Sequence, residues 1–461
     1  MLSALGLFSS ATRAVGVDIN PEYVECIRNK LVARSYPQTH VFQGDFFNMD
    51  WVQILDDLPD PILVIGNPPW VTSSELASLN SENLPQKSNF QRLGGLDAKT
   101  GKSNFDISEW MLIHILECLD RRNATMAMLC KTSVARKVLG YAWKRNLGLK
   151  RSRIHLIDAK QVFDASVDAC LLVCDVSTGA RYDQVCHVYG EISATAHQTT
   201  LGYRKNHLIA NIEYYERWKH LSGENPHKWR SGIKHDCSKV VELTKEKNGF
   251  RNKLGELYDL ETVYMYPMLK SSDIAKKRTP RPSRWMLVTQ GAIGEDTALI
   301  KHIAPKTWSY LIEHGELFDQ RQSSVYKGRP RFSIFGVGRY SFSPWKVAIS
   351  GLYKKLHFSV IGPYADKPVV LDDTCYFMPC QGKDEAQYLA ELLNSEIAKE
   401  FFKAFIFWDA KRPITASILK KLSLRALAKE MGTEERMLTF LSANGLFASS
   451  HKQLALFEQS P

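Results

Sequence analysis

The chain has 461 residues, of which 44% are apolar and 24% are charged, an ordinary composition for a globular protein of two or three domains. No apolar run approaches the roughly 20 residues that span a bilayer, and the apolar start lacks the basic region of a signal peptide, so we expect no membrane attachment. The nine cysteines form no CxxC pair and no zinc-spaced cluster, which predicts reduced thiols in the cytoplasm and no metal site.

The net charge of +11 lies in the second part of the chain. Residues 1–180 contain 19 Lys and Arg against 19 Asp and Glu, whereas residues 181–461 contain 41 against 30. A neutral part joined to a basic part predicts a polyanionic partner for the basic part. A solvated basic surface without a partner is the alternative.

The first 180 residues alternate short apolar runs with helical patterns. Helices are predicted at Pro21–Arg34 and Ile107–Leu119, and strands at Ala14–Ile19, His40–Gln43, Ile62–Ile65, Met126–Cys130, Ile154–Ile157 and Ala169–Cys174. Strands separated by helices indicate βαβ units and a parallel sheet. The last two strands are close in sequence and predict an antiparallel hairpin at one edge of that sheet.

The pattern weakens after residue 180. We interpret residues 181–275 as a connector, 276–425 as a second domain and 426–461 as a helical tail. Within the second domain, RFSIFGVGRYSFSPWKVAIS and KPVVLDDTCYFMPC predict short strands, with a bend at Gly336, and Glu385–Lys403 predicts a helix.

Polar residues follow three successive strands of the first part. Asp18 ends the first strand, Asp45 and Phe46 follow the second, and Asn67-Pro68-Pro69-Trp70 follows the third. Ligands of doubly wound sheets bind beyond the carboxyl ends of the strands, where an acidic residue can hold ribose hydroxyls and a ring can cover an adenine. Turn and core roles are the alternatives for each residue taken alone.

The chain resembles the S-adenosylmethionine-dependent amino-group DNA methyltransferases in its motifs GVDIN, QGDFF, GNPPW, SNFDISEWMLIHILE, ATMAMLCKT and DAKQVFDASVDACLLV. The order of these motifs before a basic region is similar to the gamma class, and the asparagine of NPPW is typical of adenine-N6 methylation. The resemblance implies a doubly wound, mostly parallel Rossmann-like α/β sheet followed by an α+β DNA-recognition domain. Protein-glutamine methyltransferases share a similar motif, so a protein or RNA substrate is a rival interpretation.

The resemblance also implies roles for individual residues. Asn67 and the carbonyl of Pro68 would accept the hydrogens of the adenine amine, Pro69 would stiffen the turn, and Trp70 and Phe163 would stack on the flipped base. Asp18, Asp45 and Phe46 would hold S-adenosylmethionine. Basic residues set among aromatics predict DNA contacts at Lys327, Arg329, Arg331, Arg339, Lys346, Lys411 and Arg412.

One family motif is not found. The glycine-rich loop that follows the first strand would fall at or before Met1, so we expect a chain truncated at its N-terminus. A DNA-binding remnant without cofactor binding is therefore a second rival interpretation. The expected partners are double-stranded DNA and a cognate restriction endonuclease, for a monomeric protein of a bacterial or archaeal restriction-modification system.

Overall fold

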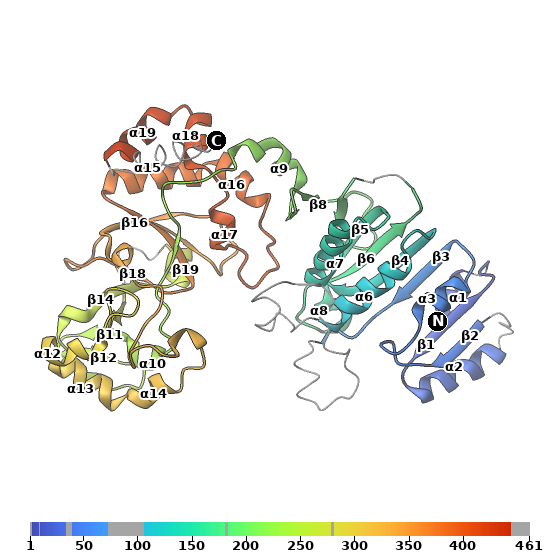
Figure 1. Ribbon diagram of the computed structural model, residues 1–461, viewed down its shortest axis with the longest axis horizontal. Helices are drawn as coiled ribbons and strands as arrows, with labels where there is room; N and C mark the ends of the chain where they lie inside the picture. Colours follow the sequence, from blue (N-terminus) through green and yellow to red (C-terminus); the bar gives the residue numbers. More distant parts are fainter. Residues whose placement is uncertain are drawn as a thin grey trace, which may run out of the picture. The chain divides into compact units, whose positions relative to one another are not determined.

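The computed structural model describes residues 2–8, 10–33, 39–71, 106–179, 183–277 and 281–443. It divides into two compact units, Met1–Ile212 and Glu213–Pro461 (Figure 1). This division differs from the expected boundaries at residues 180 and 275. Residues 183–212 extend the sheet of the first unit, and residues 213–275 supply strands to the second, so the interpretation of 181–275 as a connector is replaced.

Unit 1 contains a sheet of seven strands in the order β3-β4-β6-β5-β7-β8-β9. Its strands are β3 (Ile62–Gly66), β4 (Ala124–Lys131), β5 (Leu149–Ile157), β6 (Ala169–Val176), β7 (Val185–Tyr189), β8 (Thr199–Arg204) and β9 (His207–Ile209). The pairings make β3, β4, β5, β7 and β9 parallel in direction, with β6 and β8 reversed. The carboxyl ends of β3, β4 and β5 therefore meet at one edge.

A separate sheet is formed by β1 (Ala14–Asp18) and β2 (Thr39–Gln43). These two strands are parallel, with Ala14 opposite Thr39 and Asp18 opposite Gln43. Helix α2 (Pro21–Ala33) connects them, as βαβ geometry requires.

The six strands predicted from apolar runs are confirmed, as are the two helices, seen as α2 and α6 (Ile107–Cys118). The predicted hairpin of β5 and β6 is antiparallel as expected, but its expected position at an edge is wrong. Strand β6 inserts between β4 and β5, and β7 to β9 continue the sheet beyond β5.

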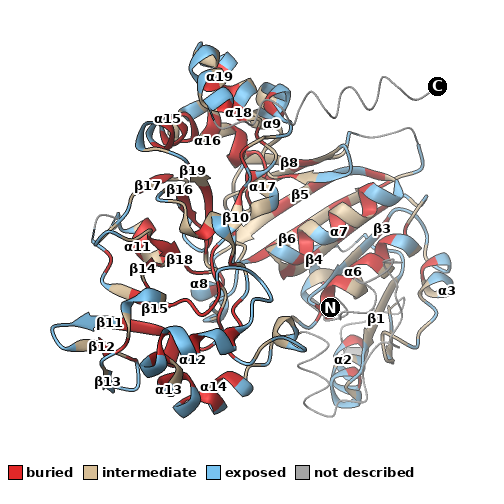
Figure 2. Cartoon of the chain, turned by 60° about the vertical axis from the view of Figure 1, so that its left-hand side comes forward, coloured by how far each residue is buried: buried red, intermediate tan, exposed pale blue. Residues whose placement is uncertain are grey.

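Helices α6 and α7 (Thr132–Arg145) cover one face of the seven-stranded sheet (Figure 1). Their apolar residues pack on alternate residues of β4, such as Met126 and Cys130, which are both 0% exposed. The buried residues of both helices are red in Figure 2. Side chains of the opposite face are less covered. Leu63 and Ile65 of β3 are 41% and 49% exposed.

Unit 2 contains two sheets, in the orders β10-β19-β16-β17 and β13-β12-β11-β15-β14-β18. The strands are β10 (Arg230–Ser231), β11 (Glu242–Glu246), β12 (Gly249–Arg251), β13 (Leu257–Tyr258), β14 (Met265–Leu269), β15 (Arg284–Leu287), β16 (Trp345–Ser350), β17 (Ser359–Ile361), β18 (Val370–Leu371) and β19 (Cys375–Cys380). The longer helices are α9 (Ile212–Trp218), α13 (Pro305–Glu313), α15 (Lys383–Asn394), α16 (Glu396–Lys403), α18 (Leu424–Glu430) and α19 (Glu434–Ala443). This mixture confirms an α+β second unit.

Two sequence predictions for unit 2 change in detail, and a third is confirmed. Of the segment 331–350, only β16 is a strand, and a 3-10 turn occupies Arg339–Phe342. The bend at Gly336 is present, with φ of 72° and no room for a Cβ, which would lie 2.8 Å from the carbonyl oxygen of Gly232. The helix predicted at Glu385–Lys403 divides at Ser395, whose hydroxyl caps α16 by accepting from the Ala398 amide.

Within the described residues, no helix has the length and apolarity needed to span a bilayer.

Candidate active site

The Asn67-Pro68-Pro69-Trp70 turn follows directly from the carboxyl end of β3. Gly66, the last residue of the strand, lies opposite Met128 of β4. The two prolines that follow have no backbone N–H, so strand pairing ends here and the backbone dihedral φ is fixed at both positions. Asn67 and Pro69 are exposed, Pro68 is buried and Trp70 is half-buried. The turn therefore exposes Asn67 to solvent on a backbone that the two prolines restrict.

The end of this turn is attached to neighbouring elements by three hydrogen bonds. The indole N–H of Trp70 donates to the carbonyl of Leu129 (3.4 Å), and the Lys131 ammonium donates to the carbonyl of Trp70 (2.8 Å). The Ile107 amide of α6 donates to the carbonyl of Val71 (3.0 Å). Strand β4 and helix α6 therefore set the position of the turn.

Phe163 lies beside Trp70, as the sequence predicts. It ends α8 (Ala159–Phe163), which follows β5, and Asp164 after it has the left-handed φ of 50°. The residue is 46% exposed, and the centroid of its ring is 6.1 Å from that of Trp70, with the ring planes at 87°. A base between two parallel rings needs about 7 Å, twice a van der Waals contact distance. The rings meet edge to face, so the predicted slot is closed in this arrangement and one ring must turn to open it.

The predicted cofactor residues lie side by side at the ends of β1 and β2. The Gly44 amide donates to the carbonyl of Asp18 (3.0 Å), which joins the two strand ends. The exposed Asp18 carboxylate accepts from the Asn20 amide, and Asp45 accepts from the Phe47 amide and the Asn48 side chain. These acidic groups with neighbouring rings fit an adenosine, whose hydroxyls and amino group are donors.

Phe46 belongs to an aromatic cluster that reaches α6. Its ring centroid is 4.6 Å from that of Trp51 and 6.1 Å from that of Trp110, and Phe47 lies 5.2 Å from Trp110. His114 stacks on Trp110 at 5.0 Å, and burial lowers the pKa of its imidazole although Glu117 opposes this. The first turns of α6 thus connect the end of β2 with the Asn-Pro-Pro-Trp turn.

The predicted DNA-contacting residues lie in unit 2, and six of the seven are exposed, namely Lys327, Arg329, Arg331, Arg339, Lys411 and Arg412. Two of them form ion pairs with acidic neighbours, Arg331 with Asp319 (2.6 Å) and Arg412 with Asp373 (3.3 Å). The prediction for Lys346 is wrong, because this residue is 1% exposed and its ammonium donates to the carbonyl of Ser343. Burial lowers the pKa of Lys346 to about 7.

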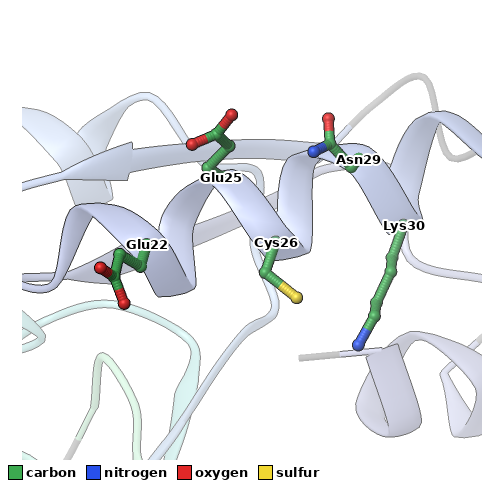
Figure 3. A pocket seen from close by; sticks show the side chains of 5 residues that line it. All are labelled: Glu22, Glu25, Cys26, Asn29 and Lys30. Carbon is green, nitrogen blue, oxygen red and sulfur yellow. The ribbon is translucent and has the colours of Figure 1, made fainter.

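A surface hollow of about 540 Å³ lies beside α2 and is lined by Glu22, Glu25, Cys26, Asn29 and Lys30. Figure 3 shows that all five side chains project from one helix and do not converge. A ligand site needs polar groups that converge, so this hollow is not a candidate site.

Sequence reasoning missed Asp106 and Lys131, which lie beside the turn. The Lys131 ammonium is 2.7 Å from the Asp106 carboxylate, and Asp106 is 7% exposed. The available signals were an aspartate before an apolar helix, typical of an N-cap, and a lysine that ends a buried strand.

Comparison with known proteins gives one close relative. No model of a protein family matches the sequence. The chain is 46% identical over 423 residues to the type II methyltransferase M.NspV of Nostoc sp., covering 92% of this chain and 88% of the relative.

A solved structure shares the fold. It is that of the type IIL restriction-modification enzyme MmeI in complex with DNA, which matches with a TM-score of 0.50 and 14% identity. The match covers 84% of this chain and 49% of MmeI, so the chain spans about half the length of that protein.

Proposed function

The chain belongs to the type II methyltransferases, and on this premise we propose that it methylates the N6 amino group of adenine in double-stranded DNA. S-adenosylmethionine would be the methyl donor, and the protein would serve as the modification enzyme of a restriction-modification system. The observation that carries the proposal is the exposed Asn67 on the rigid turn at the end of β3.

The proposed chemistry follows from the weakness of the adenine amine as a nucleophile, because its lone pair is delocalised into the ring. The Asn67 side-chain oxygen and the Pro68 carbonyl would accept its two hydrogens and favour a tetrahedral nitrogen. Accepting groups also stabilise the positive charge that develops on nitrogen during transfer. Because the prolines fix the turn, these acceptors need little reorganisation as the reaction proceeds.

Trp70 and Phe163 would stack on the target base after it leaves the duplex. Since the two rings now meet at 87°, Phe163 must swing away as the base enters. Its place at the exposed end of the short helix α8 allows this movement.

The cofactor would bind along the ends of β1 and β2. Asp18 would accept from the ribose hydroxyls, Asp45 from the adenine amino group, and Phe46 would cover one face of the adenine. S-adenosylmethionine, when bound, supplies a methyl group activated by its sulfonium.

Unit 2 would bind the DNA. The proposed contacts to phosphates and bases are the exposed basic residues of unit 2 named above. We propose that the protein acts as a monomer in the cytoplasm of a bacterial or archaeal cell, beside a restriction endonuclease that cleaves the unmethylated sequence.

An Asn67→Ala variant tests the proposal. Methyl transfer should fall by about 100-fold or more because one acceptor of the amine is lost, while DNA affinity stays within about threefold. The measurement is transfer of tritiated methyl groups to DNA together with a DNA-binding titration. Asn29→Ala, an exposed asparagine of α2, is the matched control and should keep full activity.

Two outcomes would contradict the proposal. Undiminished methylation by Asn67→Ala would remove the role of the turn. DNA binding by the unaltered chain without any methylation or cofactor binding would favour the DNA-binding remnant.

A further inference from the structure

We infer that Lys131 is a positioning residue for methyl transfer, because its ammonium fastens the Asn-Pro-Pro-Trp turn to the start of α6. This inference rests on the proposed function, since it concerns the turn that would hold the adenine amine. Lys131 itself lies outside the reacting atoms and would act through the turn.

Lys131 connects two chain segments that are far apart in sequence. Its Nζ lies 2.8 Å from the carbonyl oxygen of Trp70 and 2.7 Å from Oδ2 of Asp106. Its own backbone is held in the sheet, where Lys131 is the last residue of β4 and lies opposite Ala169 of β6. The ammonium therefore extends from a rigid support.

The Asp106 carboxylate, which accepts from Lys131, is also held in place by hydrogen bonds. Its Oδ1 accepts from the Ser108 amide (3.2 Å) and the Ser108 hydroxyl (2.5 Å), which caps α6. Oδ2 is thus left to accept from Lys131, and the side chain is only 8% exposed. A buried carboxylate needs a charged partner, so the geometry of this pair is tightly constrained.

The turn depends on these contacts because its strand lies at the end of the sheet. Among the residues that the structure describes, β3 pairs with β4 alone. Beyond the strand, the bonds from Trp70 to Leu129 and Lys131, and from Val71 to Ile107, hold the turn. Loss of the ammonium would release the Trp70 carbonyl, three residues from Asn67, and leave Asp106 without its charge partner.

An ammonium suits this place because it carries three donors and can serve a carbonyl and a carboxylate at once. Arginine would keep the charge with a planar fork of donors and should restore the function in part. Methionine has a similar length and no donor, so it removes both contacts.

The test compares Lys131→Met and Lys131→Arg with a matched control, Lys137→Met. Lys137 also pairs with a buried carboxylate of α6, since its Nζ is 2.6 Å from Oε2 of Glu109, which is 1% exposed. The two methionine variants therefore each remove the ammonium from a buried carboxylate in or directly before the first turn of α6. The variants are made in the full chain, and circular dichroism and the melting temperature check their folding.

Two measurements are made on each variant. The first is the single-turnover rate of methyl transfer at saturating DNA and cofactor, with the DNA Kd determined in parallel. The second is hydrogen exchange at the Ile107 amide, which donates to Val71 and reports the attachment of the turn without any catalysis.

Lys131→Met should lower the single-turnover rate by about 100-fold, with the DNA Kd changed by less than about threefold, since misplacement by about 1 Å has this effect. Exchange at Ile107 should be at least about tenfold faster in this variant. Lys131→Arg should regain part of the rate, and Lys137→Met should keep both the rate and the exchange of the unaltered chain.

The inference would be overturned if Lys131→Met left Ile107 exchange unchanged, if both methionine variants lost activity equally, or if the loss lay in the DNA Kd alone. If Lys131→Met does not fold, Asp106→Asn replaces it, because it removes the charge and keeps an acceptor for the Ser108 amide. If the unaltered chain transfers no methyl group, the proposed function fails, and the exchange measurement still decides whether Lys131 holds the turn.

Discussion

At the scale of single residues, Lys346 is the least expected side chain of unit 2. It is 1% exposed, its ammonium donates to the carbonyl of Ser343, and it lies 5.9 Å from the centre of the Phe377 ring. Burial disfavours the charged form and lowers the pKa to about 7. An unfolded chain would protonate this lysine up to about pH 10.4.

This difference predicts a pH-dependent stability. Between about pH 7 and 10 the unfolded state binds the additional proton, so the free energy of unfolding rises with pH over this window. Lys346→Met should remove that contribution and stabilise the protein at pH 7 by about 1–3 kcal/mol, with a smaller gain at pH 10. Denaturant unfolding at several pH values measures both effects, with the exposed Lys327→Met as control. Equal pH profiles for Lys346→Met and the unaltered chain would contradict the prediction.

The residues of the candidate site show which of its features could be predicted from the sequence. Asn67 and Trp70 could be placed at the end of a strand from the sequence pattern, and the resemblance to the methyltransferase family brought Phe163 beside them. The edge-to-face contact of the rings could not be predicted, since side-chain orientation depends on local packing. Lys346 was misplaced because β16 is buried on both faces, so alternation along it does not identify a solvent side. Asp106 and Lys131 were missed because only the fold brings them together.

At the scale of elements, one arginine organises the segment that carries most of the proposed DNA contacts. Arg321 donates to the carbonyls of Ser333 (2.6 Å), Arg331 (3.0 Å) and His235 (3.2 Å). Its guanidinium also lies 3.7 Å from the centre of the Tyr326 ring. These bonds fix a segment without regular strands, from which Lys327 and Arg329 project.

Arg321→Met should therefore weaken DNA binding about tenfold. Arg321 is half-buried and would act by holding the segment in place. Each charged hydrogen bond that is lost contributes about 1.5–3 kcal/mol to the stability of that segment. A fluorescence anisotropy titration with a DNA duplex measures the change. Arg425→Met removes an exposed ion pair with Glu434 and should leave the affinity unchanged. An unchanged affinity for Arg321→Met would separate this segment from DNA binding.

The elements also differ in how well sequence predicts them. Apolar runs identified β1 to β6 because strands concentrate branched aliphatic side chains. Strands β7 to β9 were missed because VCHVY, TTLGYR and HLI mix polar and apolar residues. The order of the strands could not be predicted, because it depends on pairing between segments far apart in sequence. The insertion of β6 between β4 and β5 is an example. The break at Ser395 follows from a local N-cap inside a periodic apolar pattern.

At the scale of the whole molecule, the observed units preserve the separation of charge. Met1–Ile212 contains 22 basic and 21 acidic residues, and Glu213–Pro461 contains 38 and 28. The excess of ten positive charges therefore lies in the unit that carries the proposed DNA contacts.

Such a distribution predicts that DNA affinity falls steeply with salt. If all six exposed basic residues contact phosphates, a plot of log K against the logarithm of the salt concentration should have a slope of about −5. Each neutralised phosphate contributes about −0.9 to this slope. Replacing Lys327 and Arg329 by glutamine should reduce the slope by about 2 units. Lys346→Met should not alter it, because that lysine is buried. A flat salt dependence would contradict binding through the second unit.

The exposed Leu63 and Ile65 of β3 offer apolar surface to the surroundings of the molecule. Together with Ala127, which lies opposite Ile65 in the neighbouring strand, they form an apolar strip at one margin of the sheet. Each square ångström of such surface gains about 25 cal/mol on leaving water. In a thin aqueous film, as on a cryo-microscopy grid, this strip would favour the air boundary. Particles would then lie preferentially with that side toward the boundary, and the preference would be seen in their distribution of views.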